Sequence, residues 1–128
     1  MTTQESRFTP SMTEVFRRDA DIPTIQIKSV EGGTAGQLPT MKLLMSTPDM
    51  NFLKIFRKKG ELASRHAHTD HSTVCCLLSG KVKLFIGDET FIAEAGDVWM
   101  HPRGVIHQTE ALEDSVQIEV KAPACKTW

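Results

Sequence analysis

Turn-forming residues recur so closely along this chain that neither a long helix nor a long strand can form. Gly80, Gly87 with Asp88, and Gly96 with Asp97 separate short runs in which apolar and polar side chains alternate. Alternation with a period of two is the pattern of extended strands, and helical periodicity is almost absent. Because no crossover helices are available between the strands, the pattern favours an all-β sandwich or small barrel over a parallel α/β fold.

The expected strands cover most of the chain after residue 24. They are residues 24–30, 41–45, 51–57, 74–80, 81–87, 90–96, 98–101 and 115–123. Thr13 is a candidate N-cap for a short helical turn from Glu14 to Arg18, and Pro23 interrupts any longer helix. We therefore predict an N-terminal extension over residues 1–24 and one barrel domain over residues 25–128, since this length suffices for a single core.

Composition excludes several kinds of partner. The formal charge is −1, with 15 basic and 16 acidic residues scattered along the chain, so no basic face for nucleic acid is expected. No apolar run approaches the roughly 18 residues of a membrane span, and the N-terminus lacks the apolar core of a signal peptide. The three cysteines, Cys75, Cys76 and Cys125, include no CxxC pair, which fits a reducing compartment. We expect a cytoplasmic protein with a small-molecule substrate.

The histidines are concentrated in one part of the sequence. All five lie between residues 66 and 107, and His66 and His68 are two positions apart, so on an extended strand both imidazoles leave the same face. His107 follows a turn set by Pro102 and Gly104. Three neutral imidazoles suit Zn, Ni, Fe or Cu and leave coordination positions open. The pattern predicts a three-histidine metal site.

The spacing of these residues resembles the two histidine motifs of the cupins, which are double-stranded β-helix (jelly-roll) barrels. The first motif is carried by Gly60, His66, His68, Thr73 and Gly80, and the second by Gly96, Pro102, Gly104, His107 and Ala111. Two members differ, because the family usually has Glu at the position of Thr73 and often has Asn at that of Ala111. Residues 110–123 also resemble the last strand of small single-domain cupins, among them those that help linearise unsaturated uronates.

The resemblance implies one divalent metal per subunit, held by His66, His68 and His107 inside the barrel mouth, with Fe first and Zn, Ni or Mn as alternatives. Thr73 supplies no charge, so the metal should be more Lewis acidic and should suit an anionic chelate such as an enolate or a catecholate. The leading function is a non-haem Fe(II) dioxygenase of diketones or aromatic diols. The alternatives are a non-redox sugar isomerase, cyclase or lyase like the uronate-processing cupins, and a non-catalytic protein that binds a metal or small ligand.

Three further residues are candidates for moving a proton. They are His71, which is also a possible fourth ligand, His101 and Glu119. The alternatives without a functional role are a solvated loop position for His71 and core packing beside Trp99 for His101. Gln117 and Glu119 share one face of their strand, which lines a wet cavity or meets solvent.

The sequence also bears on an anion-binding residue, on the cysteines and on oligomerisation. Arg57 and Lys54 lie on opposite faces of one strand, so one of them could pair with a substrate anion. Thr73 and Cys75 share a strand face, and Cys75 is expected to be an apolar filler rather than a ligand. Apolar outer strands at residues 24–30 and 41–45 predict a homodimer.

Overall fold

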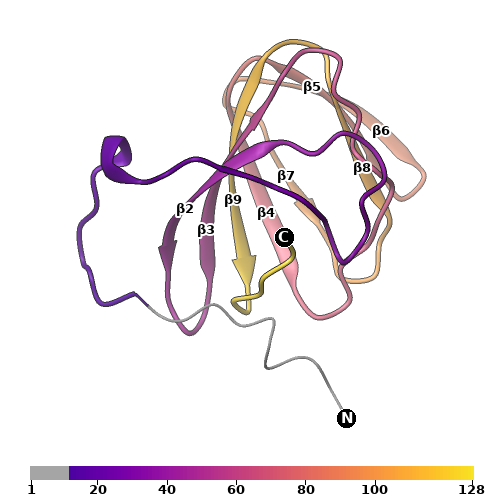
Figure 1. Ribbon diagram of the computed structural model, residues 1–128. Helices are drawn as coiled ribbons and strands as arrows, with labels where there is room; N and C mark the ends of the chain where they lie inside the picture. Colours follow the sequence, from indigo (N-terminus) through magenta and orange to yellow (C-terminus); the bar gives the residue numbers. More distant parts are fainter. Residues whose placement is uncertain (1–11) are drawn as a thin grey trace.

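The alternating runs form nine strands that face one another in two sheets (Figure 1). The structure is a computed structural model and describes residues 12–128. The strands are β1 (Ile25–Gln26), β2 (Thr40–Ser46), β3 (Asn51–Arg57), β4 (Ser72–Ser79), β5 (Lys81–Ile86), β6 (Glu89–Glu94), β7 (Val98–His101), β8 (His107–Ala111) and β9 (Ser115–Ala122). The all-β, double-stranded β-helix prediction is confirmed.

The two sheets are antiparallel and unequal in size. The larger has the order β1-β2-β3-β9-β4-β7 and the smaller the order β6-β5-β8. The segment before β4 runs beside β8 through isolated bridges that pair Leu62 with Glu110 and His66 with His107. The first histidine motif thus extends the small sheet at the β8 side.

Apolar side chains fill the barrel at two places. One cluster joins the larger sheet to the N-terminal segment and consists of Ile27, Met41, Leu53 and Ile55. The other fills the space around β4, β5 and β6 and consists of Leu77, Val82, Leu84 and Ala93. The inward face of β9 is different, because every second residue is polar and buried: Ser115, Gln117, Glu119 and Lys121. A buried polar strand face inside a barrel marks the place where a site is to be sought.

The predicted helical turn from Glu14 to Arg18 is wrong. The structure has instead a single 3-10 turn, η1, at Asp19–Asp21. Arg17 explains the difference, since its guanidinium donates to the carbonyls of Leu43 and Leu44 at 2.9 Å and draws the segment along β2. No helix among residues 12–128 is long and apolar enough to cross a membrane.

Two strand predictions also need correction. The strand expected over residues 24–30 is reduced to the two residues of β1, and the chain then turns at Glu31, which has a positive φ of 50°. β8 was not predicted, because its five residues are largely polar and give no apolar run. It forms because it pairs with β5 on one side and with the first histidine motif on the other.

The outer face of the larger sheet is apolar around β4 and β7. Val74 pairs with Met100 and Cys76 pairs with Val98 in the ladder between these strands. The exposed fractions of Val74, Val98 and Met100 are 52%, 70% and 51%. In this part of the molecule, apolar exposure is therefore greater than on β2, where Met41 is buried and the remaining apolar residues are half-buried.

The turn from β4 into β5 is closely packed at Gly80, the residue that closes the first motif. Its φ is +90°, and a Cβ there would overlap the carbonyl oxygen of Asp114 and the Cα of Ser115. Gly96 has a similar φ of +94° but open space at the Cβ position.

We expect Gly96→Ala to lower the free energy of unfolding by about 1–2 kcal/mol through backbone strain, and Gly80→Ala to lower it clearly more. Urea denaturation of both metal-free variants measures this, and equal losses would show that the close approach of Asp114 does not matter.

Candidate metal centre

His66 and His107 are brought together by their main chains. The amide of His66 donates to the carbonyl of His107 at 3.1 Å, and the amide of His107 donates to the carbonyl of His66 at 2.8 Å. Residues directly paired in an antiparallel ladder present their side chains on the same face. Both imidazoles therefore enter the barrel side by side. His68 follows two residues later, and its carbonyl accepts from the amide of Gly104 in the second motif at 2.7 Å.

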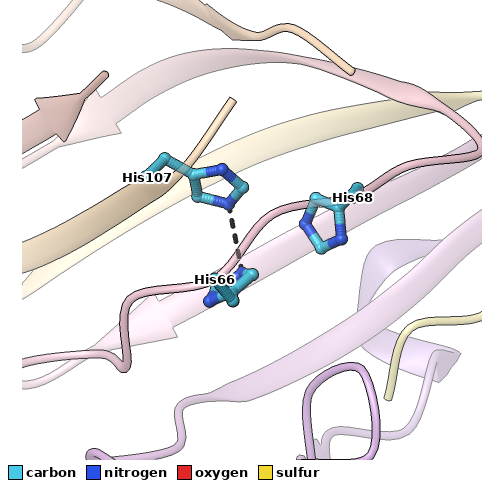
Figure 2. Close-up of side chains that lie close together, drawn as sticks. All are labelled: His66, His68 and His107. Carbon is cyan, nitrogen blue, oxygen red and sulfur yellow. Dashed lines mark hydrogen bonds between the residues drawn. The ribbon is translucent and has the colours of Figure 1, made fainter. Parts of the chain in front are cut away.

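The ligating nitrogens of the three histidines converge, as Figure 2 shows. The Nε2 atoms of His66 and His107 are 3.1 Å apart, and each of the three residues offers a nitrogen within 4.8 Å of the other two. Two nitrogens bound to one divalent ion at about 2.1 Å lie about 3.0–3.4 Å apart. The separation of His66 and His107 fits two ligands of one ion.

Hydrogen bonds fix which nitrogen each imidazole presents. The Nδ1 atoms of His66 and His107 face the carbonyl of the residue two positions earlier, at 3.0 and 3.4 Å. Nδ1 of His68 lies 2.7 Å from a carboxylate oxygen of Glu31. An acceptor at Nδ1 places the proton there and leaves Nε2 as a lone pair. Without a metal, one of the two Nε2 atoms can donate a hydrogen bond to the other across 3.1 Å, and a bound cation would take the place of that proton, so the donor set fits a divalent metal.

Burial keeps these imidazoles neutral. It lowers the pKa of His66 and that of His68, and the charge of Lys121 lowers the pKa of His68 further. Burial, with His101 and His66 as neighbours, lowers the pKa of His107 to about 2. Because only a neutral imidazole has a lone pair to share, protons do not compete for the site at neutral pH.

The two other histidines differ in their relation to this group. His101 lines the same cavity and stacks on His107, with ring centroids 3.7 Å apart, and burial lowers its pKa to about 4. As predicted from alternation, it shares the inward side of β7 with Trp99 while Val98 and Met100 point outward. It is thus both a packed residue and a cavity residue.

His71 is fully buried, which corrects the alternative that it is a solvated loop histidine. Its ring centroid lies 4.5 Å from that of His68, and its Nδ1 is 2.7 Å from the carboxylate of Asp70. It is not among the residues that line the cavity, and its nitrogens fall outside the group formed by the three converging histidines. His71 therefore belongs to the wall behind His68.

Thr73 occupies the position at which the first cupin motif usually has Glu. It is fully buried on β4 and pairs in the ladder with Lys121 of β9, whose Nζ donates to the Thr73 hydroxyl at 3.3 Å. Nζ of Lys121 also lies 3.6 Å from the carboxylate of Glu119. Where a carboxylate would bring negative charge to the metal, this chain places an ammonium group.

Glu119 is an ionised carboxylate in the same cavity. It accepts a hydrogen bond from Nε2 of Gln117 at 2.7 Å. Burial opposes its ionisation, but the charges of Lys121 and Arg57, with that of His101 where it is protonated, outweigh burial and lower the pKa of Glu119 to about 2. Glu119 and Lys121 therefore line the cavity, and Ser115 and Gln117 on the same face of β9 are also buried.

The basic residue of β3 that reaches the cavity is Arg57. It lines the cavity with Lys121, whereas Lys54 points outward and lies 3.3 Å from the carboxylate of Asp19. Nε of Arg57 is buried and has no hydrogen-bond partner among residues 12–128. Arg57 and Lys121 against Glu119 leave the cavity with an excess of positive charge before any metal is considered.

Cys75 points inward as expected and is fully buried, and burial raises the pKa of its thiol. A thiol with a raised pKa is a poor ligand and fits its predicted role as an apolar filler.

Sequence reasoning missed two residues of the site. Lys121 could have been found, because it continues the inward alternation of Gln117 and Glu119. Glu31, which fixes the His68 ring, could not, because it stands in a loop and its placement depends on a main-chain hydrogen bond to the carbonyl of Thr127 at 2.8 Å.

Comparisons with known proteins agree with this geometry. The model of the cupin domain family matches residues 55–120. No curated protein matches the chain. Among solved structures, the chain is similar to an RmlC-like cupin from Shewanella frigidimarina NCIMB 400, with a TM-score of 0.75 and 21% identity over 88% of this chain and 93% of that one.

Two other solved structures share the fold at low identity. One is described as a predicted oxalate decarboxylase from Thermotoga maritima, with a TM-score of 0.72 and 19% identity over 83% of this chain and 96% of that one. The other is KdgF from Halomonas sp., with a TM-score of 0.64 and 24% identity over 66% of this chain and 80% of that one. The family model covers more than half of the sequence and includes all three converging histidines. The chain therefore belongs to the cupin family.

Proposed function

We propose that this protein is a metal-dependent enzyme that binds a small anionic oxygen substrate, in the leading form a non-haem Fe(II) dioxygenase of diketones or aromatic diols. The observation that carries the proposal is the contact between Thr73 and Lys121 beside three neutral histidines. This arrangement supplies three nitrogen ligands and no carboxylate ligand, and Lys121 offsets the charge of Glu119, so an anionic substrate would balance the charge of the ion.

In this proposal the neutral histidines bind the metal and the cationic residues bind the substrate. His66, His68 and His107 would hold the ion, which supplies a Lewis acid and, as iron, a route to oxygen chemistry. Lys121 and Arg57 attract and orient an enolate, catecholate or carboxylate, because both cations line the cavity with the histidines. The apolar cluster next to the cavity, which includes Ile27, Met41 and Leu53, favours a compact organic substrate.

A second candidate function is non-redox proton transfer, as in a sugar isomerase, cyclase or lyase. Glu119 favours it, since a buried carboxylate that remains ionised in the cavity can accept a proton from a carbon next to a metal-polarised carbonyl. His101 lines the same cavity and is an alternative acceptor. His71 lies outside the cavity, so this structure gives no support for it as the base.

Metal content separates the two candidates. We expect protein purified without a tag or chelator to carry close to one iron per chain, lost in His66→Ala, and to consume oxygen with acetylacetone or catechol. Elemental mass spectrometry and an oxygen electrode make the measurements. Zinc, nickel or manganese that is lost in His66→Ala and gives no oxygen uptake would favour proton transfer, and a metal lost in His66→Ala without any turnover in the wild type would support a binding protein.

Kinetic variants of the two charged residues test their separate roles. Lys121→Met should raise KM at least tenfold for an anionic substrate while the metal is retained, because a binding cation is lost. If Glu119 is the base, Glu119→Gln should lower kcat by about a hundredfold or more under nitrogen, measured as exchange of the C–H next to the carbonyl in D2O by NMR. Glu94→Gln, at an exposed position on β6, is the matched control. Unchanged exchange in Glu119→Gln would exclude Glu119 as the base.

We also propose that the protein is a homodimer in which the apolar outer face of β4 and β7 covers the same face of a second copy. This patch is uncharged at Val74, Val98 and Met100 and continues onto β9 through the pairing of Val74 with Val120. A self-complementary apolar patch is what a two-fold contact requires.

Light scattering after size-exclusion chromatography tests this contact. Val98→Lys should convert a dimer into a monomer at micromolar concentration, because it buries a charge at the centre of the patch. Ile25→Lys, on β1 at the opposite edge of the sheet, should leave the dimer intact. A monomeric wild-type protein would contradict the proposal, and dissociation by Ile25→Lys alone would place the contact at β1.

A further inference from the structure

A second group of metal-ligating side chains lies next to His68 but outside the cavity. Asp70, His71 and Cys125 each offer one ligand atom within 4.8 Å of the other two, and none of them lines the cavity. We propose that these three side chains form a second divalent-metal site, of the type that binds zinc. The proposal does not depend on the reaction proposed above.

The fold builds this group from the two ends of a strand pair. Ser72 at the start of β4 pairs with Ala122 at the end of β9, so the turn before β4 meets the segment after β9. The carbonyl of Cys125 accepts a hydrogen bond from Nδ2 of Asn51 at 3.0 Å, and Asn51 is itself fully buried. Cys125 is thereby fixed against the turn that carries Asp70 and His71.

The donor atoms match the preference of zinc for sulfur, nitrogen and carboxylate oxygen. Sγ of Cys125 lies 3.5 Å from Oδ2 of Asp70, and Nδ1 of His71 lies 2.7 Å from Oδ1 of Asp70. Ligands of one tetrahedral zinc lie about 3.3–3.8 Å apart, so only a small rotation of the carboxylate is needed. Binding releases the thiol proton to solvent, and the thiolate and carboxylate then balance the two charges of the ion.

One buried nitrogen of this group has no hydrogen-bond partner among residues 12–128. His71 is fully buried, yet its Nε2 has no hydrogen-bond partner among residues 12–128. A buried polar atom without a partner points to a water or an ion that completes its surroundings. The ion would bind Nδ1, the nitrogen that faces Asp70, and the ring proton would then reside on Nε2, where a buried water would accept it.

The position of the group indicates a structural role. Beyond Cys125, Thr127 and Trp128 line the cavity, and the Thr127 carbonyl accepts from the amide of Glu31, whose carboxylate holds His68. An ion at Asp70, His71 and Cys125 would fasten the C-terminal segment to the first histidine motif. It would therefore support the wall of the cavity.

The experiment removes the three-histidine site and measures the zinc that the protein still binds. In a His66→Ala, His107→Ala double variant of the full chain, we expect about one zinc per chain after dialysis, measured by elemental mass spectrometry. With cobalt as the probe, we expect a near-ultraviolet thiolate-to-cobalt charge-transfer band, because only the second group contains sulfur. Zinc should also raise the melting temperature of this variant.

Cysteine variants in the same background decide the outcome. Cys125→Ser should lose the bound zinc, the cobalt band and the thermal shift, whereas Cys76→Ser, on the outer face of β4, should keep all three. If Cys125→Ser does not fold, as judged by circular dichroism, Asp70→Asn replaces it. A folded double variant that holds no zinc, or zinc binding that survives both Cys125→Ser and Asp70→Asn, would overturn the proposal.

Discussion

The main-chain pairing of His66 with His107 is the contact on which the site depends. It joins the first histidine motif to β8, although 41 residues separate the two histidines in the sequence. Two backbone hydrogen bonds hold this pair, so the separation of the imidazoles is set by sheet geometry and not by flexible side chains. The stacking of His101 on His107 and the contact of His68 with Glu31 then limit the rotation of the rings. A metal would meet ligands already close to their bound positions.

The inward face of β9 gives this barrel its particular chemistry. Gln117, Glu119 and Lys121 point inward from this strand, are buried, and are linked to one another by a hydrogen bond and an ion pair. The cost of burying these charges is offset because the ammonium and the carboxylate are adjacent and both are hydrogen-bonded. With Thr73 at the position where the family usually has Glu, and with Lys121 paired to it, this part of the wall carries a positive charge. Under the proposed function, this charge favours an anionic ligand.

Much of this could be predicted from the sequence, because strand alternation and motif spacing are local signals. The inward side of β7, the burial of Cys75 and the approach of His66, His68 and His107 follow from period-two alternation and from the turn at Gly104. The helical turn at 14–18 failed because Arg17 binds carbonyls of β2, a contact that propensity does not include. Glu31, β8 and the burial of His71 likewise depend on residues distant in sequence.

Two clusters of opposite character therefore meet at His68. On the cavity side, neutral imidazoles stand with Arg57 and Lys121, which repel a cation unless an anion accompanies it. On the side of His71, Asp70 and Cys125 supply two groups that can carry negative charge. Under the two proposals, the second cluster would supply the charge that balances its own cation, whereas the first would bind a cation most tightly when an anionic substrate accompanies it. If an anionic substrate completes the charge at the three-histidine site, the absence of a carboxylate at Thr73 makes metal binding and substrate binding mutually dependent.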